Sequence, residues 1–571
     1  MMQRSLLSSV FAGVTTVLVA QEPVLPGSLV ARSILDWVAD YEQQRLSPKS
    51  TLRVGGDLQP RYVVSMRRAG LVHEGDEGRV THLDMLGKLL FFAEKNPSDD
   101  LARAVLGVAA AGLEHSLVDR ETMEVRELGH WTLVRSEGRG SWFVILRAAA
   151  GERLPLFGEL QPLDAKAGQG ITAGPARRVA ALRLLGSKNL PVFRSTLEAA
   201  LVDPEPRVRL AAAEALSPPW RVETMRAVVH ALASERHPVV SQALVRLLLG
   251  MLRLPPEDLA VEARAAVVDS ALQQLGRCGW RTDMELLDVV EAFPHKDAIP
   301  RLIELLDLQI RSPDALVTAV NKRASPLLRQ KAGGLLRAMT GAILPDNEPA
   351  RWREFWDKER ERLRVPERLS RPEASRTRAT FFDVPVTGAS VAFLIDNSGS
   401  MDAGAGGAET GLRRRRPMTR LEAAKEQLVL AVQSMPQEST YQVLTFAASA
   451  RRWTPQPVPA DARSLRSLTE LLGRIGIDGG TNLHDGLQAA LQWQQLRFGE
   501  VGKAGIDELF VLSDGEPTMG PVQDPEALLA MVREANKYAH IRIHCVFTGA
   551  GQGADLLRQL AEQNGGQFVQ R

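Results

Sequence analysis

The C-terminal third of the chain contains the stretch that decides its fold, Val391-Ala-Phe-Leu-Ile-Asp-Asn-Ser-Gly-Ser400. Its first five residues are apolar, as in a short buried strand, and polar residues follow at once. Further apolar runs of this kind lie at 441–446, 508–512 and 541–547. Amphipathic helical segments alternate with them at 420–435, 483–496, 524–538 and 554–564. This order predicts a doubly wound, Rossmann-like α/β domain with a largely parallel sheet, whose ligand site lies at the carboxyl ends of the strands.

Oxygen-bearing side chains cluster at the ends of these segments. The candidate ligands are Asp396, Ser398, Ser400, Thr481 and Asp514. Hard oxygen donors without His or Cys suit Mg²⁺, with Mn²⁺ or Ca²⁺ as alternatives, rather than zinc. Two carboxylates and neutral hydroxyls leave the ion incompletely neutralised by the protein. Such a metal can accept an Asp or Glu carboxylate from another protein.

The same residues resemble the metal-ion-dependent adhesion site of von Willebrand factor A domains. The resemblance covers residues 388–571: Asp-x-Ser-x-Ser stands at 396–400, Asp-Gly-Gly-Thr-Asn at 478–482 and Leu-Ser-Asp-Gly-Glu-Pro-Thr at 512–518. It implies that the two serines bind the metal directly and that Thr481 binds directly or through water. The aspartates would act largely through water. It also implies a metal-dependent protein-binding or adhesion module.

One segment departs from the family pattern. Between Met401 and Arg420 a Gly/Ala-rich stretch and four arginines, 413–416, stand where many relatives have a short connection. We expect a solvated loop; the alternatives are that its charge recruits an acidic partner or that it gates access to the metal. Asp402 is a candidate for an outer contact to the metal.

Catalysis is not expected of this domain. Phosphatases of the haloacid dehalogenase type also begin with an Asp after a strand, but they need a second Asp two residues later, where this chain has Ser398. The sequence contains no Gly-x4-Gly-Lys-Ser/Thr phosphate loop, no His-Glu-x-x-His zinc helix and no Gly-x-Ser-x-Gly elbow at Ser398.

Residues 175–345 are predicted to form a HEAT-like α-solenoid. Similar Ala/Leu-rich helices begin at Pro175, Pro206 and Pro238, a period of about 31 residues, which is typical of stacked helix pairs. The segment 203–216 is the best single match to the repeat. Beyond residue 250 the pattern is less regular: 298–306 reads as a first helix and 325–332 as the start of a second. An irregular helical domain is the alternative. A solenoid offers an extended surface for protein contact.

Two regions flank the predicted solenoid. Residues 25–170 are expected to be mostly helical, with a candidate β-hairpin formed by 131–135 and 141–146, and no function is assigned to them. Residues 346–387 are expected to form a charged helix, with Trp352 and Trp356 as packing anchors, followed by a linker at 370–378.

The N-terminal residues 1–20 resemble a signal peptide, since one Arg precedes an uncharged, mostly apolar run. An uncleaved anchor or a buried helix is the alternative, and no other segment is apolar enough to span a membrane. The formal charge of +2 argues against a dedicated nucleic-acid binder. Cys278 and Cys545 are too few for a disulfide framework.

These features favour an exported protein (periplasmic, cell-surface or secreted) that displays a metal-dependent binding module on a helical scaffold. If the first twenty residues stay in the cytoplasm, the alternative is a scaffold or assembly factor working with a chaperone-like ATPase. In a third alternative the repeats organise the cell envelope and the metal only stabilises the fold.

Overall fold

The computed structural model describes residues 27–571, apart from 45, 53–59, 69–70, 114–118, 137–138, 155–170, 253–260, 278–279, 308–314, 367, 370–378, 405–417, 437–438, 494–504, 540 and 550–552. The chain divides into two compact units, residues 1–231 and 232–571. The boundary falls inside the range predicted as a solenoid. Within the described ranges, no helix has both the length and the apolar character needed to cross a bilayer. The predicted signal peptide and the predicted linker at 370–378 lie outside those ranges.

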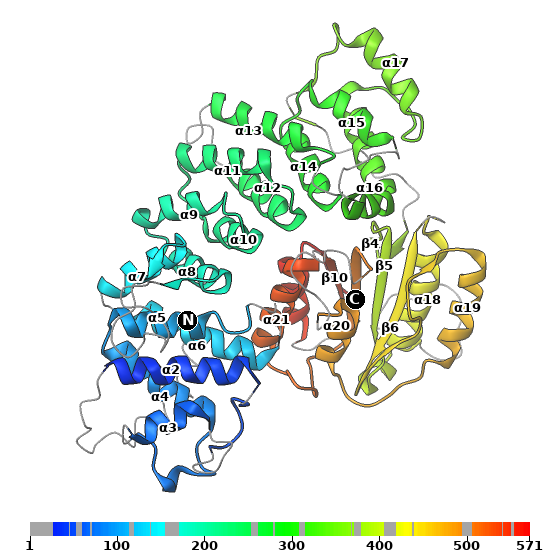
Figure 1. Ribbon diagram of the computed structural model, residues 1–571. Helices are drawn as coiled ribbons and strands as arrows, with labels where there is room; N and C mark the ends of the chain where they lie inside the picture. The colour runs from blue at the N-terminus through cyan, green and yellow to red at the C-terminus, as the bar shows by residue number, and fades with distance from the viewer. Residues whose placement is uncertain are drawn as a thin grey trace. The chain divides into compact units, whose positions relative to one another are not determined.

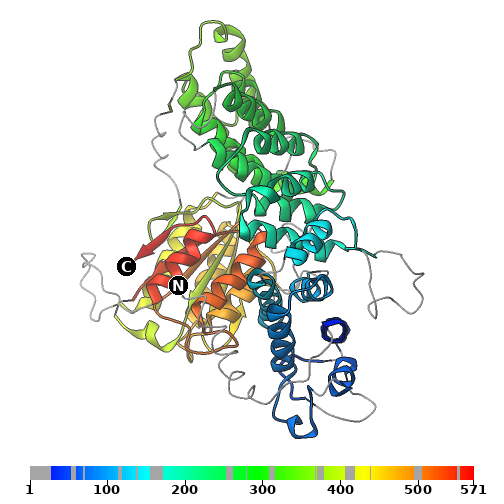
Figure 2. The same cartoon turned by 90° about the vertical axis from the view of Figure 1, so that its left-hand side faces the viewer.

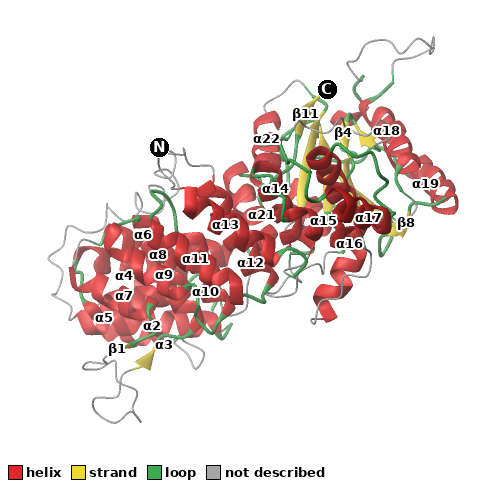
Figure 3. Ribbon diagram, turned by 90° about the horizontal axis from the view of Figure 1, so that it is seen from above, coloured by secondary structure: helices red, strands yellow, loops and turns green. Residues whose placement is uncertain are grey.

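Helices make up nearly all of the first unit (Figures 1 and 3). In chain order they are α2 (Gly27–Glu42), α3 (Arg61–Arg68), α4 (His82–Lys95), α5 (Asp99–Ala109), α6 (Arg120–Arg135), α7 (Arg139–Ala149), α8 (Pro175–Lys188), α9 (Arg194–Ala200), α10 (Pro206–Ala215) and α11 (Val222–Ser234), which runs across the boundary. The sequence marks several of their ends. Thr81 and Asp84 form a capping box at the start of α4, and proline occupies the first turn of α8 and α10.

The β-hairpin predicted at 131–135 and 141–146 is wrong, because these segments lie in α6 and α7. Their buried residues recur at helical spacing, as Leu128 and Thr132 do in α6 and Val144 and Ala148 do in α7. Short apolar and β-branched runs do not by themselves distinguish a strand from a helix. A small antiparallel pair, β1 (Arg153–Leu154) and β2 (Ile171–Thr172), lies elsewhere in the unit.

Helices begin at Pro175, Pro206 and Pro238, as the sequence predicted. Helices α8 and α10, which α9 separates in the sequence, pack closely through small residues. A Cβ placed on Gly186 of α8 would come within 2.6 Å of the Cβ of Ala215 in α10, so only glycine fits at that contact. Arg178 of α8 also forms an ion pair with Asp203, in the turn before α10. These contacts explain the Ala/Gly-rich pattern, while the HEAT-like classification stays a prediction.

The second unit begins with further helices and ends in an α/β region, residues 379–571. The helices are α12 (Pro238–Leu252), α13 (Val261–Gln274), α14 (Trp280–Ala292), α15 (Ala298–Leu306), α16 (Ala315–Thr340) and α17 (Pro349–Glu359). The helix start predicted at 325 is wrong, since this position lies within α16. Trp352 of α17 is fully buried, and its indole N–H donates to the carbonyl of Pro345 at 3.0 Å, as expected of a packing anchor.

The α/β region contains one mixed sheet and one short hairpin. The sheet strands are β5 (Ser390–Asp396), β6 (Thr440–Phe446), β7 (Ala450–Arg452), β8 (Val458–Pro459), β9 (Glu508–Ser513), β10 (Arg542–Phe547) and β11 (Phe568–Gln570). They run in the order β11-β10-β9-β5-β6-β7, with β8 also on β6. The five strands from β11 to β6 are parallel, whereas β7 and β8 are antiparallel to β6. The hairpin pairs β3 (Thr380–Phe381) with β4 (Val384–Pro385).

Helices cover both faces of the sheet (Figure 1). One face carries α18 (Arg420–Ser434) and α19 (Ala462–Arg474), and the other carries α20 (Leu483–Leu491), α21 (Pro525–Ala539) and α22 (Gly553–Gln563). Figure 2 shows the orange-to-red helices lying across one face. The four strands and four helices predicted here are thus present, while α19, the hairpin and the short strands had not been predicted.

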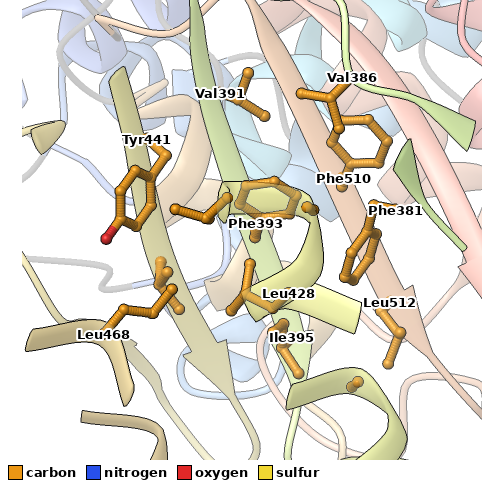
Figure 4. Close-up of a cluster of buried hydrophobic side chains, with 14 of the residues drawn as sticks. Phe381, Val386, Val391, Phe393, Ile395, Leu428, Tyr441, Leu468, Phe510 and Leu512 are labelled. Atoms are coloured by element: carbon orange, nitrogen blue, oxygen red, sulfur yellow. The ribbon is translucent and has the colours of Figure 1, made fainter. Parts of the chain in front are cut away.

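Alternate residues of each strand fill two apolar layers. Val391, Phe393 and Ile395 of β5 point to the same side as Phe510 and Leu512 of β9, and they pack under α18 and α19 (Figure 4). The rings of Phe393 and Phe510 stack with centroids 5.4 Å apart. Because the central strands are buried on both faces, a site open to a ligand is expected at their ends.

Candidate metal centre

Three loops meet at the carboxyl ends of β5, β6 and β9. The loop after β5 is tied to the loop before α20 by two backbone hydrogen bonds: Gly399 N donates to Gly479 O at 3.0 Å and Asp478 N donates to Asn397 O at 2.8 Å. Asn397 N also donates to Phe446 O at the end of β6. The backbone therefore holds the segments 396–400 and 478–482 side by side.

The two predicted serine ligands lie next to each other. Their hydroxyl oxygens are 3.2 Å apart, and Ser400 Oγ donates to Asp514 Oδ1 at 2.7 Å. Adjacent ligands of an octahedral Mg²⁺ ion, with bonds of about 2.1 Å, lie about 3.0 Å apart. The spacing of the two hydroxyls therefore suits neighbouring positions around one small cation.

Asp396 lies beneath the serines and is fully buried. Its Oδ1 accepts the backbone N–H of Ser398 at 2.8 Å, and its Oδ2 accepts the hydroxyl of Ser513 at 2.6 Å. Burial raises the pKa of Asp396 to about 6, a rise that these hydrogen bonds oppose and that nearby Asp514 increases. A cation close to this buried carboxyl group would stabilise its ionised form.

Ser513 was missed as a site residue in the sequence. Its position as the last residue of β9, directly before Asp514, was the available signal. Its hydroxyl fixes the orientation of the Asp396 carboxylate, so it positions a candidate ligand.

Thr481 lies on the adjoining loop and is buried. Its N–H donates to Thr518 Oγ1 at 2.9 Å and its carbonyl accepts from Thr518 N at 3.0 Å. The next residue, Asn482, caps α20 by accepting from Asp485 N at 3.1 Å. The loop after β9 thus fixes the backbone of Thr481 through both of its polar groups.

Two glycines allow the loop after β10 to approach Asp514 closely. A Cβ on Gly549 would lie 2.4 Å from the carbonyl oxygen of Asp514, and one on Gly553 would lie 2.6 Å from the carbonyl carbon of Gly515. Both contacts are with backbone, which cannot yield as a flexible side chain can. Larger residues at these positions would displace the loop that carries Asp514.

Arg420, the first residue of α18, adds a positive charge that had not been predicted here. Its Nη1 lies 2.6 Å from Asp514 Oδ2, and the Asp514 side chain is fully buried. Asp402, the predicted outer contact, is exposed at the end of the short 3₁₀ helix η4 (Gly399–Asp402). The four arginines at 413–416 lie outside the described residues.

The structure brings Asp396, Ser398, Ser400 and Asp514 into one hydrogen-bonded group and places Thr481 on the adjoining loop. In the described part of the chain, no three His, Cys, Asp or Glu side chains gather as a metal cluster. The donors here are instead two carboxylates and neutral hydroxyls, which fit a hard divalent cation that retains water.

Comparisons with known proteins identify the type of this C-terminal domain. The von Willebrand factor type A domain family matches residues 414–569. Human inter-alpha-trypsin inhibitor heavy chain H4 is 27% identical over 183 residues, which are 31% of this chain and 17% of that protein. Rat von Willebrand factor A domain-containing protein 5A is 28% identical over 193 residues, 32% of this chain and 21% of that protein. The chain thus spans about a fifth of these relatives.

Solved structures similar to part of this chain include a von Willebrand factor type A protein from Catenulispora acidiphila. It is 22% identical, with a TM-score of 0.25, and the match covers 32% of this chain and 38% of that one. Another is proximal thread matrix protein 1 from the mussel byssus, described with a zinc-occupied MIDAS motif; it is 18% identical, with a TM-score of 0.22 and coverage of 32% and 41%. On the family match and the sequence relatives, the C-terminal region of this chain contains a von Willebrand factor type A domain at residues 414–569.

Proposed function

We propose that the α/β region is a divalent-metal-dependent protein-binding module of the adhesion type, with no catalytic role. The observation that carries the proposal is the group of oxygen donors at the carboxyl ends of the strands, where two serine hydroxyls lie 3.2 Å apart beside the buried Asp396 and Asp514. The occurrence of this domain type in the relatives named above agrees with a role in protein interaction.

The proposed roles of the residues follow their positions. Ser398 and Ser400 would bind Mg²⁺ through their hydroxyls and Thr481 directly or through water, while Asp396 and Asp514 would act largely through bound water. Mn²⁺ or Ca²⁺ are the alternative ions. When bound, the metal supplies an open coordination position that an Asp or Glu carboxylate of a partner protein can take. The protein's own part is to hold the loop that carries both hydroxyls against the loop 478–482 through backbone hydrogen bonds.

The helical regions would serve as a scaffold. We propose that residues 175–345 form a HEAT-like solenoid, supported by the proline-initiated helices and the close Gly186–Ala215 contact. Its surface would make further protein contacts. With residues 1–20 acting as a signal peptide, the protein would work at the cell surface, in the periplasm or outside the cell.

The test is capture of partner proteins by the purified full chain, with Mg²⁺ and with EDTA. A partner should be retained only with Mg²⁺, should be lost with the double variant Ser398→Ala/Ser400→Ala, and should be displaced by excess of a short Asp-containing peptide. Asp555→Ala is the matched control, because Asp555 is an exposed carboxylate on α22. Equal retention by the double variant and in EDTA would contradict the proposal.

The second candidate function is a cytoplasmic scaffold working with a chaperone-like ATPase, which requires residues 1–20 to stay attached in the cytoplasm. Cell fractionation with N-terminal sequencing separates the two. Processing after Ala20 with recovery outside the cytoplasm supports export, whereas an intact N-terminus in the cytoplasmic fraction supports the scaffold.

A further inference from the structure

Arg420 stands in an unusual electrostatic position. It is the first residue of α18, where the positive end of the helix dipole disfavours a cation. The helix itself is started by other residues: Thr419 accepts the N–H of Glu422 and Glu422 accepts the N–H of Thr419, a complete capping box. The helix therefore does not account for an arginine here.

The contact that does account for it is with the proposed metal site. Arg420 Nη1 lies 2.6 Å from Asp514 Oδ2, while the other oxygen of Asp514 accepts the Ser400 hydroxyl at 2.7 Å. The same Nη1 lies 3.4 Å from the carbonyl of Ser400. The guanidinium thus touches two of the five proposed ligand residues.

Not every hydrogen-bond donor of the Arg420 guanidinium has a partner among the described residues. Its side chain is 20% exposed, and Nε is buried with no hydrogen-bond partner among the described residues. An arginine whose donors were all paired would be a fixed structural element. Here one charged contact, to Asp514, dominates.

From this geometry we propose that Arg420 is an internal competitor of the metal, an affinity-determining residue that neutralises Asp514 and weakens binding of a divalent cation. The inference rests on the metal site proposed above. A cation bound at the two serine hydroxyls shares Asp514 with the guanidinium. Like charges this close repel, and the partly desolvated surroundings screen them less than water does. The ion must therefore displace Arg420 or bind against its charge.

The experiment is titration of the purified full chain with Mg²⁺, and separately with Mn²⁺, by isothermal calorimetry. Arg420→Gln removes the charge and keeps a hydrogen-bond donor, and it should bind both ions about tenfold more tightly than the wild type. Arg420→Lys keeps the charge and should stay within about threefold of the wild type. Arg533→Gln is the control for net charge, because Arg533 is an exposed residue of α21 whose guanidinium donates to Gln563 Oε1 at 3.2 Å in an exposed contact.

Each result has one meaning. Tighter binding by Arg420→Gln alone supports the proposal, as does binding by this variant when the wild type shows none. Unchanged or weaker binding by Arg420→Gln, in a chain whose wild type binds the ion, overturns the inference but leaves the metal site in place. Failure of both wild type and Arg420→Gln to bind either ion overturns the proposed metal site and the inference with it. Circular dichroism of each variant confirms that it is folded.

Discussion

A buried carboxylate lies near each end of strand β9, and the two carboxylates differ in how many hydrogen-bond donors surround them. At its start, Glu508 accepts the N–H and hydroxyl of Thr387, the N–H of Gly388 and Nε2 of His544, at 2.6 to 3.1 Å. At its end, Ser513 and Asp514 lie beside Asp396. The Asp396 carboxylate accepts two hydrogen bonds, from the N–H of Ser398 and the hydroxyl of Ser513. Glu508 therefore accepts four hydrogen bonds from the protein, whereas Asp396 accepts two and can accept more.

The pKa values of the two carboxyls differ accordingly. Burial raises the pKa of Glu508, but the hydrogen bond and charge of His544, with the contacts of Thr387 and Arg542, outweigh it and leave that pKa below its ordinary value. Burial also raises the pKa of Asp396, to about 6, and there its hydrogen bonds do not compensate. Burial of Glu508 is offset by the donors that surround it, whereas burial of Asp396 is not, and the proposed metal would supply the missing positive charge there.

The largest effect is expected at the structural end. Glu508→Ala leaves the donors of Thr387, Gly388 and His544 buried without an acceptor, and should lower the stability of the sheet by about 3–5 kcal/mol. Hydrogen exchange of the β9 and β10 amides in the full chain measures this. Mg²⁺ affinity of the folded fraction should stay within about twofold of the wild type, since Glu508 lies at the other end of the strand.

The pH dependence gives a control at the same residue. Because its folded pKa is lowered, ionised Glu508 contributes stability above its ordinary value of 4.5, and that contribution is lost as the pH falls through the folded pKa. The stability difference between wild type and Glu508→Gln should therefore be constant from neutral pH down to about 5 and shrink below it. A difference that grows on acidification would show that Glu508 is not held ionised by its neighbours.

The sequence predicted these two ends unequally. Asp396, Ser398, Ser400 and Asp514 were named at predicted strand ends and Thr481 before a predicted helix, because the order of apolar runs indicates which ends meet in a parallel sheet. The resemblance to the von Willebrand factor A motif picked out the same five residues. Glu508 was placed in a buried strand with no role, since its partners lie far away in the chain, at 387–388 and 544. Ser513 and Arg420 were missed for the same reason, because the carboxylates that they contact, Asp396 and Asp514, lie far from them in the sequence.

Helix and strand types were predicted where the pattern was long and failed where it was short. The four central strands and their helices were found, but 131–135 and 141–146 were assigned to strands although their buried residues follow a helical period. Strands of two or three residues, such as β7 and β11, carry too little pattern to be recognised.

A smaller effect is expected from the metal. At a concentration one hundredfold above its dissociation constant, Mg²⁺ should stabilise the α/β region of the wild type by about 2.7 kcal/mol, because it binds the folded state only. The double variant Ser398→Ala/Ser400→Ala should lose this increment, and Glu508→Gln should keep it. Hydrogen exchange with and without Mg²⁺ gives the increment for each protein. An equal increment in the double variant would mean that the ion binds elsewhere.

The smallest effect separates the two ends most directly. Thr387→Val and Ser513→Ala each remove one hydroxyl that donates to a buried carboxylate, at 2.6 Å in both cases. Each should lower stability by about 1.5 kcal/mol in hydrogen exchange without metal. Only Ser513→Ala should also weaken Mg²⁺ binding, because Asp396 then loses the contact that orients it toward the site. If both variants weakened Mg²⁺ binding equally, the two ends of β9 would be coupled through the sheet, and the division into a structural and a metal-binding end would fail.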